Sequence, residues 1–480
     1  MSSKTNDSYE LYAGFCTRDI TPRFPAALQG QFMVRVTSEV KKPLKVTAVY
    51  LETRKDDIRV EHSVWVTVDL SISSEELQNE IGRRAQGFGI DPSHVFVSAT
   101  HTHDAPFHHR NPIRTTSPEY KGDLGYPEDK VPPDCLTPEE YFEFVVSESV
   151  TAIRTAFESR RRAKMGAGAS LAKIGHCRYV LLKNLSTGKI EDHMYGYAAT
   201  REASGNMPAY EFIGFTGPDG DDTVETIGFW DDNDTLMGIV AGIHSPAQIS
   251  ESDCFVSSDI WGFARDYLAG KHKINVPVVT FCMFSGDIKP FDPYVPNNER
   301  KIEFERLAGL LADAIADGVQ KAFRIRTDKT VLCHKKISVY VPLFPVTEEK
   351  YKNALEIIEK NENVYLVFGA LGVKERYERM NVRKETEQEL LLHAVRLGEV
   401  AIGTAPFEMH LPYGLELRKL AQYEHVLPVQ LTGGHYGYLP SRKAWEYPSY
   451  GIGIVDGITS PEGGDIIVDE LAKTLNEMKK

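Results

Sequence analysis

The sequence predicts an α/β protein in which layered mixed sheets are covered by helices. Patterns typical of strands and of helices alternate along the whole chain of 480 residues. The strand candidates are short apolar runs, several of them rich in β-branched residues, whereas the helix candidates repeat apolar side chains every three or four positions. At this length the chain can bury a substantial core, as one large domain or as two to three smaller ones.

The expected strands are short hydrophobic segments bounded by polar or turn-forming residues. They cover residues 46–51, 63–70, 95–97, 226–230, 236–243, 278–283 and 400–404. A hairpin is predicted around the turn Asp231-Asp232-Asn233-Asp234, because Asp and Asn favour tight turns between two strands.

The clearest helix begins at Thr137-Pro138-Glu139-Glu140, which combines an N-cap threonine, a proline in the first turn and the glutamate of a capping box. Its expected apolar stripe is Phe142, Val146, Val150, Ile153 and Phe157. Further helices are expected over residues 75–86 and 304–323, and a helical run is expected to end around Arg396.

Composition excludes several classes of protein. The net charge of −13 opposes binding to nucleic acid or to an anionic membrane, because both need a cationic surface. No stretch reaches the roughly 18 apolar residues that span a bilayer, and residues 1–10 lack the apolar core of a signal peptide. The six cysteines form no C-x-x-C pair, which disfavours a thiolate zinc site. We therefore expect a cytoplasmic protein that acts on a small molecule, as a monomer or a homo-oligomer.

Two histidines one residue apart follow the predicted strand at 95–97. Side chains at positions i and i+2 of a strand project to the same face, so His101 and His103 can present two imidazoles to one point. Neutral imidazole is the commonest protein metal ligand and is also suited to proton transfer near pH 7. Taken alone, the tripeptide fits a plain strand end at least as well as a metal site.

Polar groups follow apolar strands at four other places. They are His244, the pair Asp287 and Lys289, Glu408, and the glycine-rich turn with His435, Tyr436 and Tyr438. In sheet-based proteins, functional groups gather at such strand ends. Each place also has a structural explanation; Asp287, for example, follows a glycine and suits a tight turn.

A long segment over residues 107–135, rich in proline, glycine and charge, separates the two histidines from the capped helix. Loops of this length without periodicity are usually functional or disordered. Because this loop adjoins the candidate site, we expect a lid.

The order of these segments resembles the neutral ceramidase family, specifically its large N-terminal catalytic domain. The matching pieces follow the family's order: Ala13-Gly14 with Asp19-Ile20-Thr21-Pro22, Ala99-Thr100-His101-Thr102-His103, His244, Ser257-Ser258-Asp259 with Gly262, Gly286-Asp287-Ile288-Lys289-Pro290, residues 397–402 with Pro406-Phe407-Glu408, and Tyr438. They span nearly the whole chain. The resemblance implies a single ceramidase-like catalytic domain over residues 1–480.

The resemblance also implies one zinc ion per chain, held by His101, His244, Glu408 and Tyr438. Two imidazoles and a carboxylate are a common catalytic zinc set that leaves room for water. A phenolate is a rarer ligand, although a cation can lower the pKa of a phenol as it does that of bound water. Tyr436 is the alternative for this fourth position.

Three departures from the family pattern accompany the retained metal positions. Lys289 replaces the family's nucleophile-like serine in G-D-x-S-P, and the family's asparagine-arginine pair corresponds to His176-Cys177 followed by Arg178. The chain ends at Lys480, without the family's C-terminal immunoglobulin-like domain. We therefore expect the same metal chemistry on a different substrate.

The favoured hypothesis is a zinc-dependent hydrolase in which metal-activated water cleaves an amide or ester bond, lactones included, of a small polar substrate other than ceramide. The predicted catalytic residues are His103, Lys289 and Asp287, and the predicted substrate-binding residues are Arg178, Tyr436 and His435. Lys289 would pair with a substrate carboxylate, stabilise an oxyanion or act as a base. Two hypotheses remain beside it: a metal-dependent lyase or isomerase acting on a sugar or hydroxy acid, and a non-catalytic protein that senses a ligand through the metal site.

Overall fold

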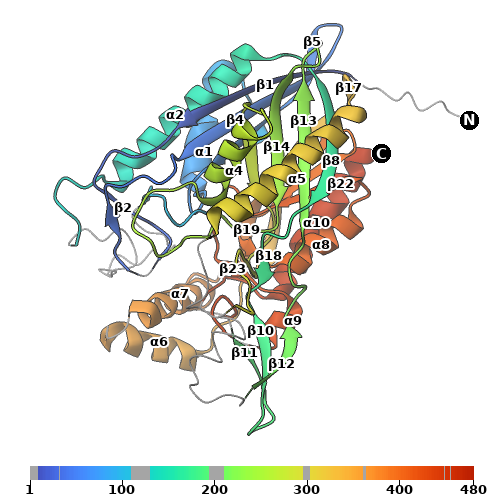
Figure 1. The fold of residues 1–480 in the computed structure, drawn as a ribbon. Coiled ribbons are helices and arrows are strands. Elements are labelled where there is room, and N and C mark those ends of the chain that lie inside the picture. The colour runs from blue at the N-terminus through green and yellow to red at the C-terminus, as the bar shows by residue number, and fades with distance from the viewer. Residues whose placement is uncertain are drawn as a thin grey trace, which may run out of the picture.

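The computed structural model describes residues 9–31, 33–109, 130–193, 210–295, 303–360, 364–447, 449–453 and 456–480. Most of the predicted lid over 107–135, namely residues 110–129, lies outside the described residues. Within the described chain, three larger sheets surround a shared core and helices pack on their outer faces (Figure 1). This arrangement confirms the predicted α/β class with layered mixed sheets.

The first sheet carries the His-x-His motif beyond its edge strand. Its order is β17-β1-β4-β5-β6, with β7 beside β1. The bounds are β1 Tyr9–Asp19, β4 Lys45–Lys55, β5 Ile58–Val68, β6 Val95–Ala99, β7 Arg161–Arg162 and β17 Lys329–Thr330. Strands β5 and β6 are parallel, with Val68 opposite Ala99, so both lead to the same end of the sheet.

The second sheet, in the order β15-β14-β13-β8, contains the predicted hairpin. The bounds are β8 Lys164–Leu171, β13 Thr223–Trp230, β14 Leu236–Ile243 and β15 Val278–Cys282. Asp231 closes the turn, because its carboxylate accepts hydrogen bonds from the amides of Asn233 and Thr235 at 3.0 and 2.9 Å. Strands β14 and β15 are parallel, so His244 and the segment after β15 leave the sheet at the same end.

The third sheet, in the order β18-β19-β20-β22, corrects one prediction. The bounds are β18 Leu332–Pro342, β19 Glu387–Leu397, β20 Val400–Thr404 and β22 His425–Val429. The helical run expected up to Arg396 was wrong, because β19 occupies that position. Its leucines favour a helix, but the segment pairs along its whole length with β18, and such tertiary pairing outweighs local propensity.

One core joins the three sheets. Trp65 and Phe96 of the first sheet lie against Phe281 of the second, with ring centroids 5.9–6.3 Å apart. The third sheet contributes Ile402 and Leu427 to the same cluster. Full burial of each such side chain contributes about 1.5–3 kcal/mol. The core therefore fixes the strand ends that carry the candidate site.

Short strand pairs connect the segments of the site. The bounds are β2 Ala26–Ala27, β3 Val36–Thr37, β9 His176–Cys177, β16 Ile288–Lys289, β21 Glu408–Met409 and β23 Tyr438–Leu439, with β10 Val180–Asn184, β11 Ile190–His193 and β12 Tyr210–Phe215 in a small separate sheet. The pair β16–β9 places Lys289 opposite His176. The parallel pair β21–β23 places Glu408 opposite Tyr438.

Helices cover the sheets on their outer sides (Figure 1). The bounds are α1 Glu75–Ala85, α2 Pro138–Ser159, α4 Asp259–Gly270, α5 Phe304–Arg324, α6 Glu348–Lys360, α7 Val364–Asn381, α8 Leu411–Leu420, α9 Arg442–Trp445 and α10 Pro461–Lys479, with 3-10 turns Gln86–Phe88 and Pro92–His94. Helix α2 packs on β1 and β4, α5 on β8 and β13, and α10 on β18 and β19. None of the helices in the described residues is long and apolar enough to cross a membrane.

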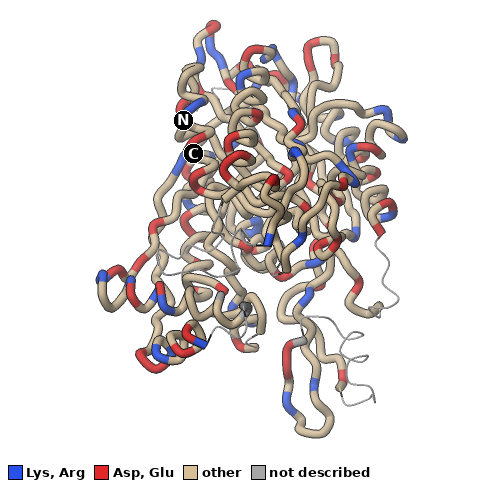
Figure 2. Tube along the Cα trace, turned by 90° about the vertical axis from the view of Figure 1, so that its left-hand side faces the viewer, with Lys and Arg blue, Asp and Glu red and all other residues tan. Residues whose placement is uncertain are grey.

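Helix α2 confirms the predicted capping box. The Thr137 hydroxyl accepts the Glu140 amide at 3.3 Å, and the Glu140 carboxylate accepts the Thr137 amide at 3.0 Å. The buried stripe differs from the predicted one: it includes Tyr141, Val145 and Ala152, while Phe142, Val150 and Phe157 are half-buried at its side. Acidic and basic residues are interspersed along the described chain (Figure 2).

Candidate metal centre

The site begins where β6 ends. The amide of Thr100 donates to the Val68 carbonyl and that of His101 to the Leu70 carbonyl, both at 3.0 Å, which extends the ladder with the β5 side. His101 then adopts a φ of 66°, a left-handed conformation that costs a non-glycine residue about 1–2 kcal/mol. Backbone strain of this kind concentrates at functional sites. The strained residue, His101, is also buried and only 4% exposed.

The imidazole of His101 is fixed at both nitrogens. Nδ1 lies 2.5 Å from the Ser71 carbonyl oxygen, and Nε2 lies 3.2 Å from Oε2 of Glu408. A carbonyl oxygen only accepts, so Nδ1 carries a proton, and Nε2 is the nitrogen directed at the carboxylate. Two acceptors face each other at this distance only with a proton or a cation between them. Bonding of Nδ1 to a carbonyl is also how metal-binding histidines are oriented.

Glu408 lies between two imidazoles. Its second carboxylate oxygen is 3.3 Å from Nε2 of His435, so a predicted substrate-binding residue lies directly against a predicted metal ligand. Burial raises the pKa of Glu408, but His101 and His435 outweigh it and hold that pKa well below its usual range. Burial lowers the pKa of His101, yet Glu408 and the Ser71 carbonyl raise it above the ordinary value. The protein therefore keeps a carboxylate paired with a positive partner at this point.

His244 is anchored in the same way as His101. Nδ1 donates to the Phe284 carbonyl at 2.8 Å, while Nε2 is buried and has no hydrogen-bond partner among the described residues. Burial, helped by Arg418, lowers the pKa of His244 to about 4, so the ring is neutral at pH 7. A buried, unused lone pair on imidazole is costly and suits a metal ligand.

The predicted ligands fit a zinc ion in chemistry but do not yet surround one point. In the described chain, the ligand atoms of His101, His244 and Glu408 do not all lie within 4.8 Å of one another. Tyr438 is held beside Glu408 by the strand pairing. The donor set is that of a catalytic zinc site, and a zinc ion would have to draw His244 toward Glu408.

A second histidine cluster lies at the opposite end of β6. Glu61, His62 and His94 form the one described trio of His, Cys, Asp or Glu whose ligand atoms lie within 4.8 Å of one another. Nδ1 of His94 is 3.3 Å from the Glu61 carboxylate. However, Nε2 of His62 already accepts the Asp91 amide at 3.1 Å, so the neutral ring keeps its proton on Nδ1. His62 has no lone pair to spare, and the trio fits a metal ion less well than the predicted set.

His103 lies in a polar network beside His101. The two rings are 4.9 Å apart, and Nε2 of His103 is 2.5 Å from the side-chain nitrogen of Gln248. Burial, and then the neighbouring His101, lower the pKa of His103 well below its ordinary value. A neutral imidazole at this position can accept a proton, as the predicted acid/base role requires.

Lys289 is partly buried in the same network and has a carboxylate partner. Its Nζ donates to Oε1 of Glu251 at 2.5 Å. Burial lowers the pKa of Lys289, and Glu251 opposes that effect. Sequence analysis missed Glu251, which follows His244 by seven residues in a polar stretch without a motif. A lysine that is largely removed from solvent needs a counter-charge, and this requirement alone could have indicated an acidic partner for Lys289.

Asp287, a predicted catalytic residue, makes a structural contact. Its Oδ1 accepts the amide of Leu411 at 2.6 Å, which is the first residue of α8. A carboxylate at this end of a helix is stabilised by the free amides and the helix dipole. Burial raises its pKa to about 6. The second oxygen lies 3.9 Å from Nδ1 of His410.

Arg178 and Tyr438 lie together, whereas Tyr436 is engaged elsewhere. The Arg178 guanidinium is 5.0 Å from the centroid of the Tyr438 ring. The hydroxyl of Tyr436 accepts from Gln388 at 3.3 Å and donates to Glu75 at 3.5 Å. Of the two candidate tyrosines, Tyr438 is therefore the one placed beside Glu408.

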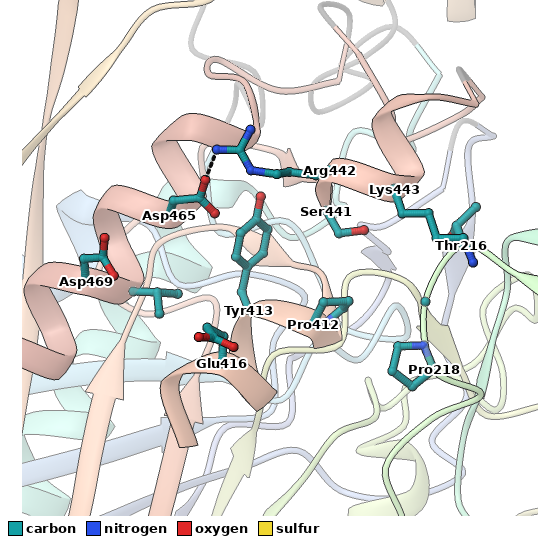
Figure 3. Close-up of a pocket in the computed structure, with 12 residues that line it drawn as sticks. Thr216, Pro218, Pro412, Tyr413, Glu416, Ser441, Arg442, Lys443, Asp465 and Asp469 are labelled. Atoms are coloured by element: carbon teal, nitrogen blue, oxygen red, sulfur yellow. Dashed lines mark hydrogen bonds and ion pairs between the residues drawn. The ribbon is translucent and has the colours of Figure 1, made fainter. Parts of the chain in front are cut away.

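A cavity of about 720 Å³ lies apart from this centre, between the starts of α8 and α9 and the side of α10 (Figure 3). In this cavity the Arg442 side chain pairs with Asp465, and the ring of Tyr413 lies next to that pair. None of its lining residues, all of them described, is a predicted metal ligand or catalytic residue. This cavity is not the candidate site.

Comparison with known proteins identifies the fold. No protein-family model and no curated protein sequence matches the chain. The crystal structure of neutral ceramidase from Pseudomonas aeruginosa is similar with a TM-score of 0.68 and 15% identity, over 98% of this chain and 75% of that one. A ceramidase complexed with C2 gives a TM-score of 0.66 and 16% identity, over 98% of this chain and 76% of that one. The chain has the fold of the neutral ceramidases, as its motifs predicted.

Proposed function

We propose that this protein is a zinc-dependent hydrolase that cleaves an amide or ester bond, lactones included, of a small polar substrate. One zinc ion per chain would be held by His101, His244, Glu408 and Tyr438. The carrying observation is the pair His101–Glu408, in which Nε2 of an imidazole whose Nδ1 is bonded to a backbone carbonyl lies 3.2 Å from a buried carboxylate. When bound, zinc supplies activated water near neutral pH and polarises a carbonyl.

The chain's own residues suit acyl-group hydrolysis. His103 is neutral and partly buried beside His101, and it is proposed to take the proton released when water attacks. Lys289 is proposed to present its ammonium to the carbonyl oxygen of the substrate, with Glu251 fixing its direction. His435, in contact with Glu408, is proposed to position the substrate or the carboxylate.

A substrate other than ceramide is proposed because the residues that read the substrate differ. Lys289 puts a charge where the ceramidase motif has a hydroxyl group, and His176-Cys177 stands where that family has its asparagine-arginine pair. A partly buried ammonium and the buried guanidinium of Arg178 suit a polar molecule better than a two-chain lipid.

The hydrolase is favoured over the lyase or isomerase by the state of Lys289. A proton-abstracting lysine needs an amine that can reach the substrate, whereas Nζ of Lys289 is held at 2.5 Å by the Glu251 carboxylate, which favours the ammonium. Solvent labelled with oxygen-18 tests this choice. Hydrolysis incorporates the label into the product acid, and exchange of solvent hydrogen alone would instead establish an isomerase.

The experiment that tests the proposal is metal analysis of the purified protein, followed by a screen of small amides, esters and lactones. We expect one zinc per chain and hydrolysis that chelator abolishes and zinc restores. Turnover that is unchanged after complete removal of metal would contradict the proposal. Zinc binding without turnover of any substrate would favour the sensor.

A further inference from the structure

Three arginines in the described chain are buried: Arg35, Arg178 and Arg376. Arg35 has a carboxylate partner, because its Nη1 lies 3.2 Å from Asp104. Arg178 and Arg376 make no ion pair with any described residue, and the Nε of Arg178 and the Nη1 of Arg376 lack a hydrogen-bond partner. A buried charge without a partner is destabilising, so a ligand that supplies the missing charge would account for both.

Arg376 differs from the basic residues around it. Arg379 pairs with Glu385 at 2.7 Å, and Arg383 pairs with Glu375 at 2.5 Å. Both of these arginines reach the surface, where a carboxylate is available. Arg376 is 4% exposed and lies on the buried side of α7. Its burial is therefore not a consequence of a general basic surface on this helix.

Arg178 packs on the segment of residues 449–453 and 456, which is bonded to Tyr438, and the charge of Arg376 acts on Asp456 of the same segment. The Asp456 carbonyl accepts the Tyr438 amide at 2.9 Å, and the Asp456 carboxylate accepts the Gly451 amide at 3.1 Å. A Cβ on Gly451 would come within 3.2 Å of Nη2 of Arg178, so this segment packs directly on that guanidinium. Burial raises the pKa of Asp456 to about 6, against the Gly451 amide and the positive fields of Arg178 and Arg376. Asp456 thus lies near both guanidinium groups and pairs with neither.

The α6–α7 hairpin is tied to the same wall of the site. The amide of Phe344, just before α6, donates to the carbonyl of Ile458 at 2.9 Å. After α7, Gln388 links the side chain of Arg379 to the hydroxyl of Tyr436, at 2.9 and 3.3 Å. Arg376 therefore enters from an element that is fixed to the Tyr436–Tyr438 turn.

We propose that Arg178 and Arg376 form an anion-binding pair beside the metal centre, and that the substrate carries a carboxylate or phosphate group there. This inference rests on the proposed hydrolase function and names its substrate class. A guanidinium binds either group through two parallel hydrogen bonds. The rings of Tyr179, Tyr438 and Tyr450 lie 4.9–5.7 Å from the Arg178 guanidinium and hold it without neutralising it.

Calorimetric titration of the full chain tests the pair directly. The probes are inorganic phosphate, N-acetylglycine and, as the neutral analogue, N-acetylglycinamide. We expect one anion to bind more tightly than the neutral amide, and the tighter anion identifies the group. In Arg376→Met its Kd should rise about tenfold or more, because a charge-assisted hydrogen bond is lost. The matched control is Arg383→Met, which removes the same charge from a paired surface residue and should leave Kd unchanged.

Thermal unfolding separates a ligand-binding arginine from a structural one. Without anion, Arg376→Met should melt no lower than the wild type, because the variant lacks an unpaired buried charge. When the anion is added, the Tm of the wild type should rise more than that of the variant. Arg376→Lys, which keeps the charge but not the fork, should bind with intermediate affinity. Equal binding of the neutral amide, or native anion affinity in Arg376→Met, would overturn the inference.

The two proposals fail separately in these experiments. Anion binding that depends on Arg376, without hydrolysis of any substrate, would leave the anion site standing and contradict the hydrolase. Hydrolysis of neutral amides that is unchanged in Arg376→Met would support the hydrolase and contradict the anion site.

Discussion

Strand β6 has histidines near both ends, and the two ends use them differently. Near its start, Trp65 donates to the Ser63 hydroxyl at 2.6 Å, Ser63 is 2.7 Å from Nδ1 of His334, and Nε2 of His334 is 2.9 Å from Nδ1 of His393. Because the tryptophan only donates, the hydroxyl proton is directed to His334, which in turn donates to His393. These imidazoles satisfy one another.

Beyond the other end of β6, the imidazoles are not bonded to one another. His101 and His244 each give Nδ1 to a backbone carbonyl, and their Nε2 atoms face a carboxylate or nothing. A metal site is thus marked by imidazole nitrogens that are directed at a carboxylate or left without a partner, and a mere gathering of histidines does not make one. The predictions below test this difference.

Removal of His101 should have the largest effect. In His101→Ala, zinc affinity should fall by more than ~10²-fold. Loss of a residue that only supports a ligand typically costs up to that much, and here a direct ligand is removed. His244→Ala should behave alike, whereas His94→Ala should keep its zinc. Zinc content by mass spectrometry and competition titration measures this. Full occupancy in both site variants would contradict the ligand set.

Lys289→Met should leave zinc bound while turnover falls about 10²-fold, because the stem remains and the charge facing the substrate is lost. Glu251→Gln should lower turnover as well, since it frees the ammonium from its fixed direction. Lys289→Ser restores the ceramidase residue, yet we expect no ceramide hydrolysis, because Cys177 remains. Native turnover in Lys289→Met would show that this lysine points away from the substrate.

Glu408→Gln should weaken zinc binding about tenfold or more while the protein stays folded, because it keeps the size of the side chain and removes its negative charge. Zinc titration together with circular dichroism checks both halves. A variant that holds zinc as the wild type does would make Glu408 a purely structural partner of His101.

His334→Leu should reveal the opposite behaviour at the start of β6. Zinc content should not change, but the free energy of unfolding should fall by about 1–3 kcal/mol, because Ser63 and His393 lose their partner inside the protein. Urea denaturation measures the loss. Loss of zinc in this variant would erase the difference between the two ends.

The smallest expected effect is a pH dependence of stability. Burial, with Lys336 nearby, lowers the pKa of His393 to about 3, below the ~6.5 of an unfolded chain. Folding therefore favours the neutral ring, so its contribution is complete above about pH 6.5 and is lost as the pH falls toward 3. Between pH 7.5 and 5.5 the metal-free protein should lose about 1 kcal/mol through this residue. Replacement of His393 by Leu should flatten the slope, and an unchanged slope would contradict the assignment.

Much of the fold was predictable because its patterns are local. The capping box of Thr137 and Glu140 and the turn at Asp231 are set by neighbouring residues, and both are confirmed. Strand β19 was missed because its leucines suit a helix and only pairing with β18 makes it a strand. The ends of β6 and β14 were predicted from the apolar runs before them.

The partners of the site residues were beyond the sequence. Glu251 and Arg376 belong to segments without motifs, and their importance follows from what lies next to them after folding. The use of Asp287 as a cap for α8 depends in the same way on a helix 124 residues further along the chain.

The most direct test of the central claim is anomalous X-ray scattering at the zinc edge from crystals grown with zinc. We predict one peak per chain, coordinated by Nε2 of His101 and His244, the carboxylate of Glu408 and the hydroxyl oxygen of Tyr438. His244 should have moved toward Glu408 to reach it. A peak at Glu61, His62 and His94, with none at His101, would contradict the account.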